Sequence, residues 1–471
     1  MAAKPIFIGG TGSHAGKSWV ATALCRYLYR RGYRVAPFKA QNMSNNSMVC
    51  ADGGEIGRAQ VAQAEACGLP PTTDMNPILL KPTGALGSQV VLNGRPWKNL
   101  KPVEYYEQFE LLLKHVLDAY ARLAAGYDYV VIEGAGSVTE LNLKHRDLVN
   151  LGLARRLNAP SMLVADIDRG GVFASVIGTF HLLEREEAAL VRSFLVNRFR
   201  GDVGLFKDGV RILEEKTQRP CLGVFPYAPD IYLDAEDSVS LEGKAAAARS
   251  GVRAAIVRLP HISNFTDFRL LPDAVYLSQP SNQEFDVIFL PGTKNTIDDM
   301  HWLRDGGFEP WLLARVEQGT KLIGICGGFQ MLGKWIVDPD GVESSSGSVR
   351  GLGLLPVETR LAREKTTRAV TARTASGVAF QAYEIHMGVT TAEREHDPFA
   401  ITDGGHADGI RTPRVMGTYL HGALENKTVL EEVIGRALPA IAGEMKDSQY
   451  DRLADWFGEH VNEEIFAREY L

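Results

Sequence analysis

The chain has 471 residues, 45% of them hydrophobic and 23% charged, and its formal net charge is −6. This length predicts about two to four domains, and the acidic balance argues against a general affinity for nucleic acid or a membrane surface. We expect a cytoplasmic protein, because no signal peptide opens the sequence and no apolar run approaches the roughly 20 residues that span a bilayer. The five scattered cysteines, with no C-x-x-C pair, read as reduced thiols: Cys25, Cys50, Cys67, Cys221 and Cys326.

The first half of the sequence alternates short apolar runs with amphipathic segments. Continuous apolar strands that alternate with helices are typical of a parallel sheet covered on both faces, in which ligands bind at the carboxyl ends of the strands. We therefore predict an α/β domain over residues 1–228. Its apolar runs are 5–8, 34–38, 129–132, 161–165 and 194–196.

A glycine-rich segment, residues 10–18 (GTGSHAGKS), follows the first of these strands and precedes a helical pattern at 19–29. This is the context of a P-loop, in which backbone N–H groups cradle phosphates, Lys17 adds positive charge and the Ser18 hydroxyl can bind Mg²⁺. The alternative is a glycine turn that binds nothing. We predict that the segment binds ATP through Thr11, Gly12, Gly16, Lys17 and Ser18.

The P-loop has one unusual position, since Thr11 stands where the usual spacing places the first glycine. This variant resembles dethiobiotin synthetase and its relatives, which activate carboxylates with ATP. Glu133 ends the strand 129–132 and is a candidate to complete the Mg²⁺ shell, although a turn-capping acid is the alternative. Asn197 ends another strand and is a candidate for binding the nucleotide base. The predicted Mg²⁺ ligands are Ser18, Glu133 and Glu55.

The character of the sequence changes at residues 229–250, where an acidic stretch is followed by an Ala-rich one, and we interpret this segment as a linker. A second alternating pattern then predicts another α/β domain over residues 251–435. Residues 436–471 have a helical pattern, and we expect this C-terminal tail to pack on the second domain. The apolar strands of the second domain include 254–257, 287–290 and 322–325.

The sharpest signal in the second domain is residues 322–332 (LIGICGGFQML), an apolar strand that runs into Cys326 and is followed by an amphipathic helix. Glycines at positions −2, +1 and +2 permit a tight strand–turn–helix elbow. A helix N-terminus stabilises the reactive thiolate, and a nucleophilic cysteine also needs a base within hydrogen-bond reach. His421, at the end of a β-like run, is the candidate base. The alternatives are a buried structural thiol and a surface or capping histidine.

Attack of Cys326 on an amide would place negative charge on the amide oxygen, so an oxyanion hole is needed. The backbone N–H of Gly327 is one candidate donor, and the turn at Gly292 can supply a second. His386 is a rival base, which we rank below His421 and interpret as a pocket residue.

Four motifs of the second domain together resemble a family of class I glutamine amidotransferases, that of cobyric acid synthase and cobyrinic acid a,c-diamide synthase. They are PGTK at 291–294, GICGG at 324–328, YEIHMG at 383–388 and TYLHG at 418–422. In the first domain, four segments are similar to the cobyric acid synthase branch, whereas the a,c-diamide synthases carry different residues after the second strand. These segments are 38–47, 54–60, 75–82 and 166–173.

One position departs from the wider glutaminase pattern. Most class I glutaminases have a Glu two residues after the catalytic His, and this chain has Ala423 there. The corrin-amidating branch resembles this chain in lacking that Glu, so another group must orient His421. Glu384 and Glu425 are both candidates, and the sequence does not decide between them.

The resemblance implies a glutamine-dependent ligase that uses ATP and Mg²⁺. Cys326 would release ammonia from glutamine with His421 as proton shuttle, and the first domain would phosphorylate a carboxylate for ammonia to convert into an amide. The implied corrinoid substrate is adenosylcobyrinic acid a,c-diamide, amidated at its b, d, e and g carboxylates, and an internal ammonia channel is expected. The candidate substrate contacts are Lys39, Gln41, Asn42, Arg58, Gln60 and Lys81.

Two other functions compete with this interpretation. One is a different glutamine-dependent ligase of the same architecture, a cobyrinic acid a,c-diamide synthase or a cell-wall lipid amidase, which segments 38–47 and 166–173 disfavour. The other is a P-loop switch ATPase with membrane, DNA or filament partners, which the intact elbow at Cys326 disfavours. We expect glutamine and a corrinoid as partners, with no nucleic acid and no membrane, and a homo-oligomer is left open.

Overall fold

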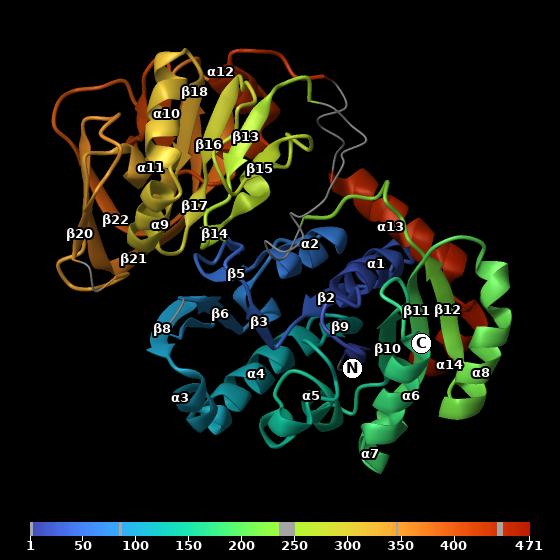
Figure 1. Cartoon of the computed structure of the whole chain (residues 1–471). Helices are drawn as coiled ribbons and strands as arrows, with labels where there is room; N and C mark the ends of the chain where they lie inside the picture. The colour runs from blue at the N-terminus through green and yellow to red at the C-terminus, as the bar shows by residue number, and fades with distance from the viewer. Residues whose placement is uncertain (1–2, 84–86, 235–249, 345–346, 440–445) are drawn as a thin grey trace.

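The computed structural model describes residues 3–83, 87–234, 250–344, 347–439 and 446–471. Two α/β domains lie side by side, which confirms the predicted fold class (Figure 1). Most of the predicted linker, residues 235–249, lies outside the described part of the chain. Within the described ranges, no helix is both long enough and apolar enough to cross a membrane.

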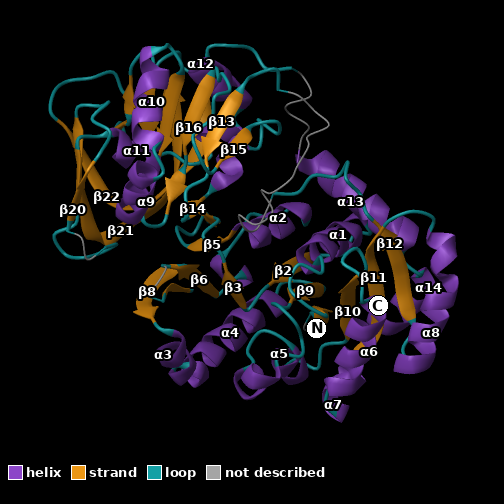
Figure 2. Cartoon of the chain, viewed as in Figure 1, coloured by secondary structure: helices purple, strands orange, loops and turns teal. Residues whose placement is uncertain are grey.

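The first domain is built on a six-stranded sheet in the order β12-β11-β10-β1-β9-β2, in which every neighbouring pair is parallel. Helices lie on both faces of the sheet (Figure 2). The strands are β1 (Lys4–Gly10), β2 (Val35–Phe38), β9 (Tyr129–Glu133), β10 (Ser161–Asp166), β11 (Val191–Phe199) and β12 (Cys221–Pro226). The helices are α1 (Lys17–Arg30), α2 (Arg58–Ala66), α3 (Pro102–Glu107), α4 (Phe109–Ala124), α5 (Leu151–Arg156), α6 (Val172–Leu182), α7 (Arg185–Leu190) and α8 (Lys207–Thr217).

The residues of β1 explain why both faces of this sheet are covered. Ile6 and Ile8 belong to the core cluster that includes the apolar face of α1, whereas Phe7 belongs to the cluster that includes α4. All three side chains are fully buried. Because side chains alternate across a strand, a run without polar residues needs a helix layer on each side.

A small sheet in the order β3-β6-β7-β8 and the antiparallel pair β4–β5 complete the first domain. Figure 1 shows β5 facing the second domain. Their bounds are β3 (Gln41–Met43), β4 (Ser47–Val49), β5 (Glu55–Gly57), β6 (Ile78–Pro82), β7 (Ser88–Leu92) and β8 (Arg95–Leu100).

The second domain has a six-stranded sheet in the order β15-β13-β16-β18-β26-β25, parallel except at β25. Its strands are β13 (Ala254–Val257), β15 (Val275–Leu277), β16 (Val287–Leu290), β18 (Lys321–Ile325), β25 (Ile410–Arg411) and β26 (Val415–Thr418). The helices of this domain are α9 (Thr296–Asp305), α10 (Phe308–Glu317), α11 (Gly327–Leu332) and α12 (Lys427–Ile434).

A further sheet of the second domain is dominated by a long hairpin, β21 (Val357–Thr374) with β22 (Ala379–Ala392). The shorter strands β14 and β17 pair separately, next to the main sheet. The remaining bounds are β14 (Ile262–Ser263), β17 (Gly292–Thr293), β19 (Trp335–Val337), β20 (Ser348–Arg350), β23 (Ala400–Thr402) and β24 (Ala407–Asp408).

The C-terminal tail packs on the first domain, so the prediction that it packs on the second is wrong. Helices α13 (Lys446–His460) and α14 (Glu463–Tyr470) lie against α1 and β12 (Figure 1). The rings of Phe457 and Phe466 lie 5.1 and 5.9 Å from that of Tyr27 on α1, between ring centroids. The periodicity of the tail specified an apolar face, but not which domain would cover it.

Candidate active site

The predicted P-loop connects β1 to α1 and folds around the side chain of Lys17. Lys17 Nζ donates a hydrogen bond to the carbonyl oxygen of Gly12 at 3.1 Å. Gly16 has a φ of 97°, and a Cβ there would lie 2.1 Å from Nδ2 of Asn197, so no other residue fits. That Nδ2 donates to the carbonyl of Ala15 at 3.0 Å. The structure thus places Asn197 directly behind the loop, at the carboxyl end of β11.

Glu133 ends β9 beside the P-loop, as the sequence predicted, and is 1% exposed. Ser18 Oγ donates to Glu133 Oε1 at 2.8 Å, Lys39 Nζ lies 2.9 Å from the same oxygen, and Gln63 Nε2 donates to Oε2 at 2.6 Å. A hydroxyl beside one carboxylate suits Mg²⁺, which completes its octahedron with phosphate oxygens and water. Among the described residues no group of three or more His, Cys, Asp or Glu could hold a metal alone.

Glu55 does not join this site, which corrects its prediction as a Mg²⁺ ligand. The carboxylate is fully buried between two lysines, Lys81 of β6 and Lys365 of β21, the latter at 2.6 Å across the domain boundary. Burial would raise the pKa of this carboxyl, but Lys365 and Lys81 hold it well below its usual range. Both of its oxygens are therefore occupied by ammonium partners rather than available to a metal.

A cavity of about 1370 Å³ opens beside the P-loop. Lys17, Ser18 and Glu133 line it, and so do three predicted substrate contacts, Lys39, Gln41 and Asn42. Residues of the second domain complete its wall, among them Arg269, Leu270 and Pro272. The cavity is therefore shared between the two domains.

The other predicted substrate contacts lie away from this cavity. Arg58 is 2% exposed and forms ion pairs with Asp234 and Glu425, and Lys81 pairs with Glu55. Gln60 is fully buried and accepts a hydrogen bond from Asn42 at 2.9 Å. The sequence pattern does not reveal that Arg58 pairs with a residue of the second domain, Glu425, or that Lys81 pairs with Glu55.

Cys326 occupies the predicted elbow between β18 and α11. Its φ of 53° is in the left-handed region that non-glycine residues rarely adopt. A Cβ on Gly328 would lie 2.0 Å from the carbonyl oxygen of Leu290, and one on Gly324 would lie 2.5 Å from the carbonyl oxygen of Gly328. The small residues around the cysteine are therefore required by close backbone packing.

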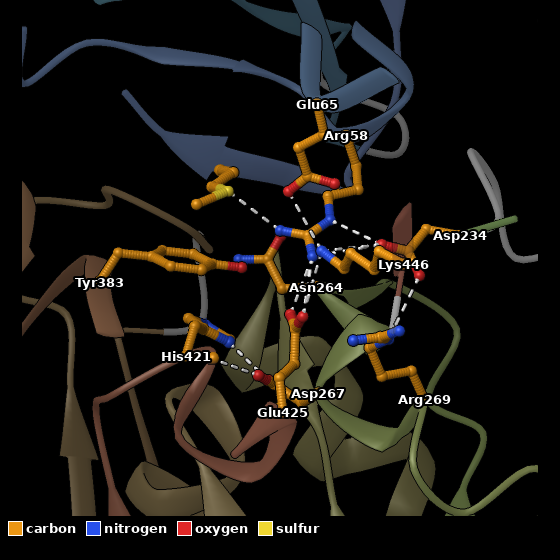
Figure 3. Close-up of polar contacts among 12 residues, drawn as sticks. Arg58, Glu65, Asp234, Asn264, Asp267, Arg269, Tyr383, His421, Glu425 and Lys446 are labelled. Atoms are coloured by element: carbon orange, nitrogen blue, oxygen red, sulfur yellow. Dashed lines mark hydrogen bonds and ion pairs between the residues drawn. The ribbon is translucent and has the colours of Figure 1, made fainter. Parts of the chain in front are cut away.

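His421 is fully buried, and the residue that orients it is Asp267, which the sequence analysis missed. His421 Nδ1 and Asp267 Oδ2 lie 2.8 Å apart (Figure 3). Burial lowers the pKa of His421, but Asp267 and then Cys326 raise it, to about 10 overall. The candidates from the sequence are otherwise engaged, since Glu384 pairs with Arg368 and Glu425 with Arg58.

No local signal marks Asp267 in the sequence. It lies in a single 3₁₀ turn, Phe265–Phe268, which packs against the turn Ala423–Glu425 that follows His421. The backbone N–H of Gly422 donates to the second carboxylate oxygen of Asp267 at 2.6 Å. Asp267 thus holds both the ring of His421 and the backbone after it.

The rival base His386 has both ring nitrogens engaged. Its Nδ1 lies 2.8 Å from the carbonyl oxygen of Gly388 and its Nε2 lies 3.5 Å from Glu384. Its ring stacks on that of Tyr419 with centroids 3.9 Å apart. By contrast, Nε2 of His421 is buried and has no hydrogen-bond partner among the described residues.

The predicted oxyanion segments meet at this site. A Cβ on Gly292 would lie 2.8 Å from Cε1 of His421, and one on Gly327 would lie 2.6 Å from Cγ2 of Thr293. A cavity of about 40 Å³ beside Cys326 is lined by Gly327 and also by Lys81 of the first domain. Thr293 follows Gly292 and lies against Gly327, so the candidate nucleophile, the candidate base and both glycine turns lie close together, and His386 also lines the cavity beside Cys326.

Both domains match known families. Residues 6–241 match the CobQ/CobB/MinD/ParA nucleotide binding domain, and residues 253–429 match the CobB/CobQ-like glutamine amidotransferase domain. Among solved structures, a crystal structure of a glutamine amidotransferase is similar to 39% of this chain and 98% of that one, with 18% identity and a TM-score of 0.31.

Two curated relatives, both named cobyric acid synthase, match almost the whole chain. The one from Bacteroides fragilis is 46% identical, over 97% of this chain and 96% of the relative. The one from Syntrophobacter fumaroxidans is 43% identical, over 98% and 97% respectively. At this identity and coverage, the chain belongs to the cobyric acid synthase family.

Proposed function

We propose that the protein makes cobyric acid by amidating peripheral carboxylates of a corrinoid a,c-diamide, with ammonia from glutamine and activation by ATP. In the family, the substrate is adenosylcobyrinic acid a,c-diamide and the b, d, e and g carboxylates are amidated. The observation that carries the proposal is the presence, in one chain, of a Cys326–His421–Asp267 constellation and a P-loop beside a large cavity. The reaction belongs in the cytoplasm, where ATP and glutamine are supplied.

The glutaminase half-reaction follows from the geometry at Cys326. His421 takes the thiol proton of Cys326 as the sulfur attacks the side-chain amide carbon of glutamine. His421 then gives that proton to the leaving ammonia, and water hydrolyses the thioester to glutamate and restores the thiol. Asp267 holds the imidazole through Nδ1, which leaves Nε2 for proton transfer. Backbone N–H groups at Gly327 and Gly292 are the proposed donors to the oxyanion.

The synthetase half-reaction takes place at the P-loop. A carboxylate does not react with ammonia in neutral water, so it is first phosphorylated, and ammonia then displaces phosphate from the acyl phosphate. Thr11, Gly12 and Gly16 would place backbone donors around the phosphates, and Lys17 would neutralise their charge. Ser18 and Glu133 would hold Mg²⁺, which supplies further charge neutralisation when bound.

The size of the shared cavity supports a large second substrate. Its volume of about 1370 Å³ exceeds the roughly 300–1,000 Å³ of ordinary ligand pockets, as a site for both a nucleotide and a corrinoid requires. Lys39, Gln41 and Asn42 line the cavity and are the proposed contacts of the corrinoid carboxylates and amides. Asn197 is the proposed contact of the nucleotide.

Mass spectrometry tests this proposal. Adenosylcobyrinic acid a,c-diamide is incubated with the full chain, Mg²⁺-ATP and glutamine labelled with ¹⁵N in its side-chain amide. We expect successive labelled amidations, which Cys326→Ala abolishes and free ammonia restores. An unchanged corrinoid mass beside active glutamine hydrolysis would overturn the corrinoid assignment and leave a ligase for a different carboxylate.

A further inference from the structure

Helix α2 carries side chains that reach both half-sites. At its N-terminus, Arg58 Nη2 donates to both oxygens of Glu425 in the second domain, at 2.9 and 3.0 Å. Less than two turns later, Gln63 Nε2 donates to Glu133 at 2.6 Å in the nucleotide site. A helix of nine residues therefore spans the distance between the two sites.

Arg58 is the centre of a buried ion cluster (Figure 3). Besides Glu425, it donates to Asp234 at 3.2 Å, and Lys446 lies 3.6–3.7 Å from these two carboxylates. The side chains of Arg58 and Asp234 are 2% and 5% exposed. Because water is nearly excluded and the guanidinium also donates to Asp234 through Nε and Nη2, the position of Glu425 relative to α2 is restricted.

Glu425 is part of the turn that carries the base. The turn Ala423–Glu425 begins two residues after His421, and Asp267 binds both the His421 ring and the backbone N–H of Gly422. Any displacement of Glu425 therefore moves the backbone beside His421 and the hydrogen bond that sets its orientation.

The first domain also supports the other side of His421. Tyr383 stacks on the His421 ring with centroids 5.4 Å apart, and its hydroxyl donates to the carbonyl oxygen of Ser47 at 3.3 Å. The backbone N–H of Ser47 donates to Asn264 at 2.9 Å. The first domain therefore contacts two residues next to His421: Arg58 binds Glu425, and Ser47 binds Tyr383.

We propose that α2 couples the two half-reactions: Arg58 is a positioning residue that holds the His421 turn through Glu425, and Gln63 ties the same helix to Glu133. This inference rests on the proposed roles of His421 and Glu133. A ligand that changes the hydrogen bonds of Glu133 acts on Gln63, and the rigid helix passes the change to Glu425. Glutamine hydrolysis therefore responds to the nucleotide site.

The role of Arg58 is tested by measuring glutamine hydrolysis and ammonia-driven amidation separately in the full chain. Arg58→Gln is expected to lower kcat for glutamine hydrolysis about tenfold or more, with KM for glutamine changed less than about threefold. Amidation driven by free ammonia should stay within about twofold, which also shows that the variant is folded. Arg58→Lys keeps the charge but has one nitrogen in place of the guanidinium that contacts both Asp234 and Glu425, so its kcat should fall between those of the wild type and Arg58→Gln.

A double-mutant cycle and a matched control decide whether the effect passes through the pair. If it does, Arg58→Gln combined with Glu425→Gln loses no more kcat than the worse single variant. The control is Arg304→Gln, since Arg304 is also partly buried and donates to a carboxylate, that of Glu309 at 2.7 Å, within the second domain. Equal losses in Arg58→Gln and Arg304→Gln would overturn the positioning role.

The role of Gln63 is tested by asking whether Mg²⁺-ATP changes the rate of glutamine hydrolysis. The rate of glutamine hydrolysis is measured with and without Mg²⁺-ATP, and Gln63→Met is expected to abolish the difference seen in the wild type. A wild-type rate indifferent to Mg²⁺-ATP would overturn the coupling. Cys326→Ala separates this from the proposed function: glutamine hydrolysis that survives in Cys326→Ala contradicts the proposed function itself, whatever Arg58→Gln does.

Discussion

At the scale of single residues, the glutaminase site shows how one acid substitutes for another. Ala423 stands where most class I glutaminases have the glutamate that orients the base, and Asp267 takes over that contact from a separate turn. Because both carboxylate oxygens are used, one for the imidazole and one for Gly422, the acid fixes both the ring and the chain that carries it. Asp267 should therefore both orient the His421 ring and stabilise its positive charge.

Asp267→Asn tests this role. An amide cannot stabilise the imidazolium as a carboxylate does, so the pKa of His421 should fall from about 10 toward the usual histidine value of about 6.5. In the proposed mechanism the protonated His421 donates a proton to the leaving ammonia, so activity should be lost as pH rises through this pKa. We expect the alkaline limb of the pH profile for glutamine hydrolysis to move to lower pH, with kcat at neutral pH reduced about 100-fold or more. Ammonia-driven amidation at each pH is the control, and an unshifted limb would contradict the role.

At the scale of elements, the tail helices act as part of the first domain. Phe457 and Phe466 are fully buried in the cluster that includes the apolar face of α1, and Arg26 of α1 donates to Asp451 of α13 at 2.8 Å. Since α1 begins at Lys17 of the P-loop, the tail supports the helix whose N-terminus faces the phosphates. The chain thus returns to its first domain after building the second.

Phe457→Ala should consequently destabilise the ATP-binding domain. Truncating a fully buried phenylalanine costs about 3–5 kcal/mol of unfolding free energy. We expect a lower thermal midpoint for the transition that ATP shifts, while glutamine hydrolysis at temperatures below it remains. Glu464→Ala, at an exposed position of α14, should change stability by less than about 0.5 kcal/mol. If Phe457→Ala lowered only the stability of the glutaminase domain, the tail assignment would be contradicted.

The elements and residues that the sequence predicted are those with a local signature. The P-loop and the Cys326 elbow each occupy about ten consecutive residues, in which glycine positions and flanking periodicity are readable together. Asp267 and the tail have no such local signature, because their contacts join residues far apart in the sequence. Asp267 meets a residue 154 positions away, and the tail meets α1 more than 400 positions away, so only the folded chain reveals either contact. The same reason explains why Arg58 was predicted as a substrate contact.

At the scale of the whole molecule, a second buried ion cluster joins the domains next to Cys326. Glu55 of the first domain lies between Lys81 of its own domain and Lys365 of the second. Both lysines line the small cavity that contains Cys326. Burial and the neighbouring positive charges outweigh the attraction of Glu55 and lower the pKa of Lys81 to about 7. Glu55 is therefore the group that holds the two ammonium groups together across the domain boundary.

Two substitutions in this cluster should differ in severity. Glu55→Gln removes the anion between two buried lysines, so Lys81 must give up its proton or stay charged without its partner, and breaking a buried pair in this way costs about 3–5 kcal/mol. Lys365→Met removes one cation, but Glu55 keeps Lys81 as its partner, so we expect a smaller loss. Urea denaturation measures both, and the exposed pair Lys334–Glu393 supplies the control, with Lys334→Met costing about 0–1 kcal/mol.

The same pair of variants tests whether the cluster seals a path for ammonia across the domain boundary. In the wild type, ammonia released at Cys326 should reach the synthetase site, so the glutamate released should match the amide formed. Loosening the boundary at Glu55 lets ammonia escape to solvent, so the ratio of glutamate to amide should rise in Lys365→Met and further in Glu55→Gln. Lys334→Met should keep the wild-type ratio, since Lys334 is exposed and pairs with Glu393 within the second domain. An unchanged ratio in Glu55→Gln, with the expected loss of stability, would mean that the cluster holds the domains together without sealing the ammonia path.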